Sequence, residues 1–308
     1  MTQENQNSRS MFHGFWALTN RDLKKWYKEP ILLFMSIIQP ILWMGLFGQA
    51  MNIGAIFTKN PITLTSIPGI PSSVLSDPNV VTILTYLGSP SFSQQIMKNT
   101  FGVDQYFSFM AVGMLSFVVV FTAMFSGMSI VWDRRLGFLN KALSTPVPRG
   151  AIIMSKVLNS VISSLIQAAI VIALALLLGM QLSASFTVLN LLVAFAALFL
   201  LCLGLSSLFL AIAIRSTRWE TQMAVVNLLN LPLLFTSNAL FPTAFMPSWL
   251  QPISNINPIT YGTEAVRQML ITSPIDFGVL AKDFAFLGGF AFLFAAVGII
   301  LSVRYLSR

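Results

Sequence analysis

The sequence predicts an all-α integral membrane protein with six transmembrane helices. Hydrophobic residues make up 56% of the 308 residues, and charged residues only 9%. A soluble domain usually carries about 25% charged residues, so this chain has too few to cover a soluble surface. Its 18 Lys and Arg exceed its 10 Asp and Glu, and most of these cations lie between apolar runs. This pattern excludes a soluble enzyme and favours membrane orientation, not nucleic-acid binding, as the role of the positive charge.

The sequence offers no conventional catalytic or metal site. It contains one cysteine, Cys202, and one histidine, His13. These are too few for an intramolecular disulfide or a His/Cys metal cluster. No Gly-Lys pair occurs, so the phosphate-binding loop of many ATPases is absent from the sequence. We therefore expect no catalytic residue, no metal and no cofactor bound by this chain.

Residues 11–29 are expected to form an amphipathic helix at the membrane interface. Aromatic and apolar residues from Phe12 to Tyr27 repeat at helical spacing, whereas Arg21, Lys25 and Lys28 fall on the opposite side. Such a helix places aromatic rings at the headgroup boundary and cations toward anionic lipid. Membrane lipids are therefore a predicted partner.

Six segments are long enough to cross a bilayer, which takes about 20 apolar residues. They cover residues 31–51, 107–131, 157–180, 186–214, 223–241 and 284–303. The third and fourth are divided at 179–185, where glycine and serine suit a tight turn. None of the six contains Asp, Glu, Lys, Arg or His. Ion-coupled pumps usually keep such groups at membrane depth, so energy for active transport must come from elsewhere.

The distribution of Lys and Arg predicts the orientation. Six spans place both termini on one side of the membrane, together with 14 of the 18 Lys and Arg. By the positive-inside rule both termini are cytoplasmic. We expect residues 1–308 to form a single transmembrane domain, multi-pass, in the plasma (inner) membrane.

Two segments on the external side are long. Residues 52–106 are rich in proline and glycine, which predicts a small, irregular external cap. Residues 242–283 are apolar for a loop and show helical spacing from Ile259. Two short re-entrant helices dipping into the outer leaflet fit this pattern. A plain surface hairpin is the alternative.

Polar residues of the fifth segment are candidates for a substrate path. Asn227, Asn230 and Asn238 lie in or near it, with Asn227 and Asn230 on one helical face. A polar stripe beside the path is one interpretation. Hydrogen bonding between packed helices is the other, at about 1 kcal/mol or less for each bond.

The cytoplasmic loop 132–156 is predicted to contain a short helix. Leu136, Leu139 and Leu143 form an apolar stripe, and the helix ends at Pro146. An exposed apolar stripe with flanking charges suits docking into the groove of another protein. Contact with lipid headgroups is the alternative.

Two of these loops resemble signatures of the type-2 ABC exporter permeases. The cytoplasmic loop is similar to their coupling-loop signature at Asp133, Arg134, Gly137, Leu139, Leu143, Thr145, Pro146 and Arg149. The second external segment is similar to the signature before their last span at Asn257, Pro258, Tyr261, Glu264 and Arg267. The amphipathic start and the six-span plan also match, so the resemblance covers essentially the whole chain.

The resemblance implies a transport subunit and not an enzyme. Such permeases work as two membrane subunits with two cytoplasmic ATPase subunits, which bind ATP and Mg²⁺ and hydrolyse the ATP. It therefore implies two copies of an ABC ATPase as partners and a second permease copy, with a homodimer expected. The coupling loop would carry ATPase movement into the spans, and the second external segment would form an outer gate.

The resemblance also separates candidate substrates. The long 52–106 segment resembles daunorubicin-resistance-like permeases, which implies export of a drug-like or lipid-like amphipathic compound from the cytoplasm or inner leaflet. A polysaccharide or glycolipid exporter of the same family is the alternative. A secondary transporter or channel, and a membrane-embedded enzyme, are weaker alternatives because the sequence lacks ionisable groups or reactive clusters at depth.

Overall fold

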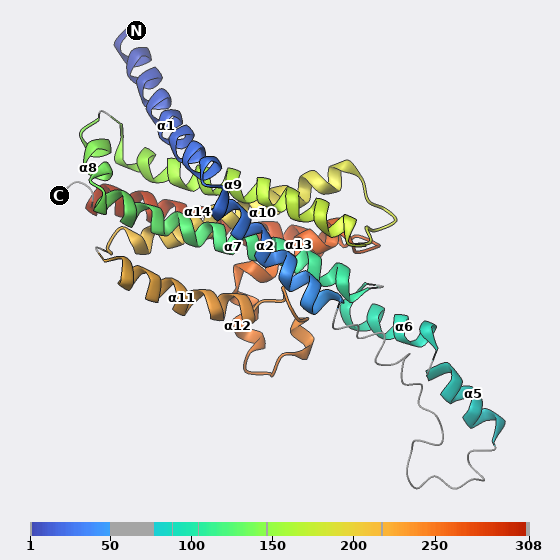
Figure 1. Ribbon diagram of the computed structural model, residues 1–308. Coiled ribbons are helices and arrows are strands. Elements are labelled where there is room, and N and C mark those ends of the chain that lie inside the picture. The colour runs from blue at the N-terminus through green and yellow to red at the C-terminus, as the bar shows by residue number, and fades with distance from the viewer. Residues whose placement is uncertain are drawn as a thin grey trace.

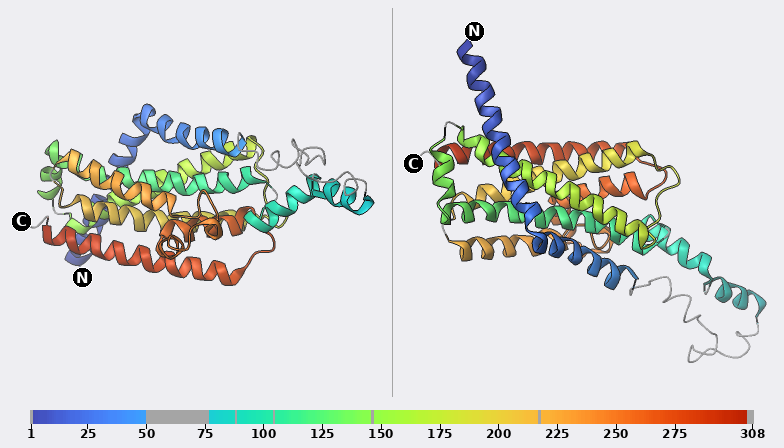
Figure 2. Two further views of the ribbon diagram at one scale, coloured as in Figure 1. Left: turned by 90° about the horizontal axis from the view of Figure 1, so that it is seen from below. Right: turned by 45° about the horizontal axis from the view of Figure 1, so that its top comes forward.

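The computed structural model describes residues 2–49, 77–87, 89–103, 105–145, 147–216 and 218–305 (Figure 1). These residues contain helices and no strand. The longest helices are α1 (Thr2–Lys28), α7 (Tyr106–Arg135), α9 (Arg149–Leu177), α10 (Val188–Ala213) and α14 (Phe277–Tyr305). The last four pack side by side as a bundle, and α1 crosses it obliquely against α9 (Figures 1 and 2).

Among the residues that the structure describes, four helices, α7, α9, α10 and α14, are long and apolar enough to cross a membrane. They contain most of the predicted segments 107–131, 157–180, 186–214 and 284–303. The predicted turn at 179–185 is confirmed, because α9 ends at Leu177 and α10 begins at Val188. The protein is therefore a helical membrane protein with several apolar helices.

The other two predicted segments form shorter helices. Segment 31–51 corresponds to α2 (Pro30–Trp43), which continues into a π-helical turn, η1 (Met44–Gln49). Pro40 lies inside α2, as expected for a kinked first span. Segment 223–241 corresponds to α11 (Trp219–Phe235), which has 17 residues. Their crossing of the membrane stays a prediction.

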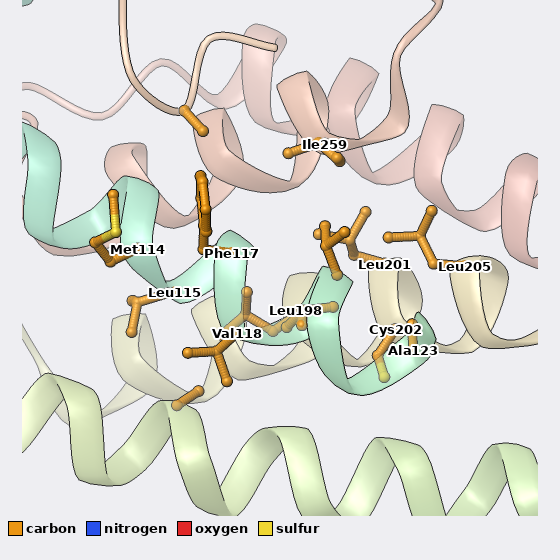
Figure 3. Packing of buried hydrophobic residues seen from close by; sticks show 14 of the residues in the cluster. Met114, Leu115, Phe117, Val118, Ala123, Leu198, Leu201, Cys202, Leu205 and Ile259 are labelled. Carbon is orange, nitrogen blue, oxygen red and sulfur yellow. The ribbon is translucent and has the colours of Figure 1, made fainter. Parts of the chain in front are cut away.

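The centre of the bundle is α7, most of whose residues are buried. In Figure 3, Val118 of α7 lies beside Leu198 of α10, whereas Leu201 of α10 lies toward the helix that carries Ile259. The helices approach closely at glycine: a Cβ on Gly127 would lie 2.8 Å from the backbone oxygen of Phe209. Small residues permit such backbone contact, the main source of packing energy between helices in lipid.

The buried face of α9 mixes apolar residues with several polar ones that bond to neighbouring helices. Ser160 shares a hydrogen bond of 2.8 Å with Ser206 of α10, and Thr122 of α7 donates one of 2.8 Å to Gln167. By contrast, large apolar side chains such as Leu228 and Phe292 point outward. This arrangement is typical of a bundle whose outer surface meets hydrocarbon.

The predicted external segments are more helical than expected. Most of the described residues between 77 and 103 belong to two helices, α5 (Pro78–Leu87) and α6 (Pro90–Phe101). These helices extend away from the bundle (Figure 1). The prediction of an irregular segment is therefore wrong for these residues, while 52–76 lie outside the described residues. Pro78 and Pro90 stand at the start of these helices, where the fixed φ of proline suits the first helical turn, so proline here begins helices and does not interrupt them.

The second external segment contains the two short helices that were predicted. They are α12 (Gln251–Ile256) and α13 (Pro258–Leu270), preceded by a 3₁₀ turn, η3 (Thr243–Phe245). Most of α13 is buried, with contacts to α7, α10 and α14, which is incompatible with a plain surface hairpin. Whether α12 and α13 enter the outer leaflet stays a prediction.

Candidate functional site

Predicted cytoplasmic features gather at one end of the bundle. The loop between α7 and α9, with its short helix α8 (Phe138–Leu143), lies at the same end of the bundle as the last turn of α14 (Figure 1). The α9–α10 turn and α5–α6 lie toward the other end (Figures 1 and 2). This separation matches the predicted alternation of sides.

Asp133, the first residue of the predicted coupling signature, is buried in an ion-pair cluster. Its Oδ2 lies 2.5 Å from Lys156 Nζ on α9, and its Oδ1 lies 3.2 Å from Arg21 Nη2 on α1. Asp22 lies 3.4 Å from both Lys156 and Arg21. The side chains of Asp133 and Lys156 are 6% and 4% exposed. Burial of two charges is tolerated when both are paired in this way.

The next residues hold the start of the loop. Arg134 donates hydrogen bonds of 2.8 and 2.7 Å to the backbone oxygens of Ile214 and Ser216, at the end of α10. A cation there also complements the helix dipole. Gly137 adopts a left-handed conformation with φ of +72°, which turns the chain from α7 into α8.

The predicted apolar docking stripe of α8 is not exposed as a whole. Leu139 is 2% exposed and Leu143 is half-buried, both against the protein's own core, whereas Leu136 is 68% exposed. The expectation that all three face outward is therefore wrong for Leu139. Among the described residues from 135 to 145, the exposed ones are Leu136, Arg135, Asn140, Lys141, Ser144 and Thr145. Helical spacing identified the stripe but not the side of it that the bundle covers.

The remaining coupling residues have local roles. The Thr145 hydroxyl donates a hydrogen bond of 2.6 Å to the Ala142 backbone oxygen, close to the end of α8. Arg149 is half-buried at the first position of α9. Pro146 lies outside the described residues.

The three asparagines of the predicted substrate path differ in their exposure. Asn227 is exposed and Asn230 is buried, although both belong to α11. Asn238 is also buried, but it lies beyond the helix and donates a hydrogen bond of 3.0 Å to Glu264. Asn238 therefore joins the predicted gate residues, and Asn230 lies within the protein.

The predicted gate residues Glu264 and Arg267 belong to a polar cluster around α13. Arg267 Nη1 lies 3.9 Å from Glu264, and its Nη2 donates a hydrogen bond of 3.0 Å to the Ala239 backbone oxygen. The guanidinium also lies 3.5 Å above the Phe109 ring of α7. Burial lowers the pKa of Arg267 to about 10, while Glu264 and Tyr106 oppose that shift. Arg267 therefore stays cationic at neutral pH and holds α13 to α7 and the 239 turn.

Asn257, Pro258 and Tyr261 shape the beginning of α13. Asn257 Oδ1 accepts a hydrogen bond of 3.0 Å from the Ile259 N–H, and Pro258 follows as the first helical residue. The Asn257 amide donates a bond of 2.6 Å to the backbone oxygen of Leu233, near the end of α11. The Tyr261 ring stacks on Phe286 of α14, with centroids 3.9 Å apart. These residues join α13 to both neighbouring helices.

The cytoplasmic cluster includes three residues that the sequence did not predict for it: Arg21, Asp22 and Lys156. Arg21 was expected to face away from the protein with Lys25 and Lys28, but it points to Asp133. One signal was available: Lys156 is a charge placed directly before an uninterrupted apolar run. Cations at that depth require a partner, and only the fold identifies Asp133 and Asp22 as that partner.

The chemistry of both clusters is ion pairing and hydrogen bonding. Within the described ranges, no group of three His, Cys, Asp or Glu residues is arranged to hold a metal ion. Cys202 is buried, and burial suits a packing role. The described clusters therefore suit mechanical connection between helices.

Comparisons with known proteins agree with this architecture. The sequence profile of the family described as ABC-2 type transporter matches residues 13–271. The chain is 30% identical over 271 residues to ycf38 of Cyanophora paradoxa, which is named as a transport permease; the match covers 87% of this chain and 78% of that protein. It is 29% identical to ycf38 of Porphyra purpurea, over 85% of this chain and 75% of that protein. It is 24% identical to the daunorubicin resistance ABC transporter permease protein DrrB1 of Streptomyces coeruleorubidus, over 61% and 63% of the two chains.

Proposed function

The chain belongs to the ABC-2 type transporter family, and on that premise we propose that it is the permease subunit of an ATP-driven exporter of amphipathic drug-like or lipid-like compounds. The observation that carries the choice of substrate is the similarity to DrrB1, which is named for daunorubicin resistance. The long 52–106 segment points to the same class. The absence of ionisable residues from the six predicted segments supports energy supplied by ATP hydrolysis on another subunit.

The proposed assembly contains two copies of this chain and two ABC ATPase subunits, which bind ATP and Mg²⁺. The protein lies in the plasma (inner) membrane with both termini in the cytoplasm. In this topology α2 and α11 cross the membrane as well, which gives six spans. The excess of Lys and Arg in the predicted cytoplasmic segments supports this orientation.

The ATPase would contact the exposed part of the α7–α9 loop. Leu136 gives that surface an apolar centre, and Arg135 and Lys141 flank it with positive charge. An apolar centre with a charged rim is typical of protein interfaces. Movement of the ATPase would then reach the bundle through Arg134 and Asp133, which connect the loop to α10, α9 and α1.

The outer gate would be formed by α12 and α13. Asn257 joins α13 to α11, and Arg267 joins it to α7. A change in the spacing of α7 and α11 would therefore shift α13. The substrate path would lie beside these helices, with Asn230 and Asn238 as candidate polar contacts.

Affinity purification from native membranes and transport in vesicles together test the proposal. We expect an ABC ATPase to co-purify in equal amount, and inside-out vesicles with the complex to take up daunorubicin with ATP but not with a non-hydrolysable analogue. The double change Leu136→Asp with Lys141→Glu should remove the ATPase. The matched control Arg218→Glu alters an exposed cation of another predicted cytoplasmic loop and should retain it.

Different outcomes would redirect the assignment. ATP-dependent export of a polysaccharide or glycolipid, without uptake of daunorubicin, would favour the alternative exporter of the same family. Solute movement by the purified chain alone, without ATP, would favour a channel or secondary transporter.

A further inference from the structure

The four charges of the cytoplasmic cluster close an alternating ring. Going round it, Arg21 contacts Asp133, Asp133 contacts Lys156, Lys156 contacts Asp22, and Asp22 contacts Arg21. Each charge has two opposite neighbours within 3.4 Å, and the four sum to zero. Two members lie on α1, one on α7 and one on α9. The ring therefore joins three helices, of which α7 and α9 flank the coupling loop.

One face of α1 is built for this contact. Gly14, Leu18, Arg21 and Asp22 follow at positions i, i+4, i+7 and i+8, which share one side of a helix. Leu18 packs on the hydrophobic core. Lys24, Lys25 and Lys28 are exposed on the remaining surface. The helix thus presents separate faces to the protein and to its surroundings.

This face of α1 also contacts the coupling loop directly. The Arg21 guanidinium lies 3.2 Å above the ring of Phe138, the first residue of α8. Gly14 lies one helical turn before Leu18 and packs closely against Val147, which is at the other end of the loop. A Cβ on Gly14 would lie only 2.5 Å from Val147 Cγ2. The two ends of the loop are therefore both in contact with α1.

The ring contains more ion pairs than are needed to neutralise its two most buried charges, Asp133 and Lys156. Asp133 and Lys156 already neutralise each other, and a pair that keeps both members avoids the cost of a lone buried charge. Arg21 and Asp22 are more exposed, with 35% and 13% of their side chains accessible. Their contacts add a connection from α1 to a pair that does not depend on them.

We propose that this four-charge ring is a positioning device that fixes α1 to α7 and α9 at the two ends of the coupling loop. Together with the Arg21–Phe138 contact, it makes α1 and the loop, with its helix α8, move as one unit. Arg21, Asp22 and Lys156 are then positioning residues for coupling, in addition to the loop's own residues. The link to coupling rests on the proposed exporter function, whereas the fixing of α1 does not. In the exporter, movement imposed on α8 by the ATPase would also displace α1.

Spin-label distances test the fixed connection in the purified full chain. Labels at Lys25→Cys on α1 and Lys141→Cys on α8 replace exposed side chains, and the native Cys202 is buried. The test variant carries Arg21→Gln and Asp22→Asn, which removes one cation and one anion but leaves the Asp133–Lys156 pair intact. The matched control carries Lys28→Gln and Glu29→Gln, which makes the same change in charge outside the ring.

We expect a narrow distance distribution in the parent and the control, and a broader or shifted one in the ring variant. A distribution in the ring variant that equals the parent's would overturn the proposal, and so would equal broadening in the control. Thermal unfolding of each variant, measured alongside, separates local release of α1 from loss of the fold: the ring variant should keep the parent's Tm within a few degrees.

A second readout concerns coupling in the complex with its ATPase. In the ring variant we expect ATP hydrolysis to continue while daunorubicin uptake per ATP falls. The expected fall is about 2- to 30-fold, as is typical of mutations that lie between two coupled sites. An unchanged ratio would overturn the coupling role. If no ATPase co-purifies and no daunorubicin moves even in the parent, the proposed function fails, and the spin-label result still decides the ring.

Discussion

Lys156 illustrates how a single buried charge is made acceptable. Its side chain is 4% exposed, and it contacts both Asp133 and Asp22. Without the ammonium, two carboxylates would share a buried site with Arg21 alone. Removing one member of a buried pair leaves an uncompensated charge and costs about 3–5 kcal/mol.

We therefore expect Lys156→Met to lower the free energy of unfolding by about that amount. The measurement is the Tm of the purified chain in detergent. Lys141→Met, at an exposed position of α8, is the control and should leave the Tm unchanged. Equal Tm values for the two variants would show that the ion pairs contribute nothing to stability.

The turn at position 137 requires glycine, because its φ of +72° is unfavourable for residues with a Cβ. Gly137→Val should cost about 1–3 kcal/mol and misplace α8, because a β-branched residue resists this conformation. Gly137→Asn should be milder, since asparagine tolerates it. The fraction of ATPase that co-purifies measures the effect. Equal retention by the two variants would mean that the Gly137 turn does not determine how the ATPase docks.

Close helix contact matters most at the scale of elements. A Cβ on Gly127 of α7 would lie 2.8 Å from the Phe209 backbone oxygen of α10, and backbone there cannot easily move. A Cβ on Gly289 of α14 would meet nothing within 4 Å. Substituting alanine at Gly127 therefore tests helix packing, whereas the same substitution at Gly289 tests only helix propensity.

Gly127→Ala is expected to destabilise the protein by about 1–3 kcal/mol through overpacking. Gly289→Ala should be neutral or stabilising by up to about 1 kcal/mol, because alanine favours helix. Thermal unfolding of both purified variants gives the comparison. A stable Gly127→Ala protein would mean that α7 and α10 lie farther apart than described.

At the scale of the whole molecule, orientation follows from the two ends of the bundle. We expect Lys141→Cys in α8 to react with a membrane-impermeant maleimide only after the cells are permeabilised. Ala184→Cys, in the α9–α10 turn, should react in intact cells, because this turn lies toward the opposite end of the bundle (Figure 1). The native protein is the control, since Cys202 is buried. The reverse pattern would invert the proposed topology.

The sequence alone determined the class of the protein and the location of its long helices. Composition and apolar run length predicted the membrane bundle, because a bilayer needs about 20 apolar residues for each crossing. Glycine and serine at 179–185 predicted the α9–α10 turn, and helical spacing of apolar residues predicted two short helices in 242–283. These properties depend on neighbours in the chain, so one-dimensional patterns reveal them.

Tertiary structure decided which residues act together. It placed Leu139 against the core although its spacing resembled an exposed stripe, and it left Asn227 exposed while burying Asn230. It joined Arg21 and Asp22 to charges that lie more than a hundred residues away in sequence. Periodicity identifies a face of a helix, but the partner of that face and the pairing of buried charges follow only from packing in three dimensions.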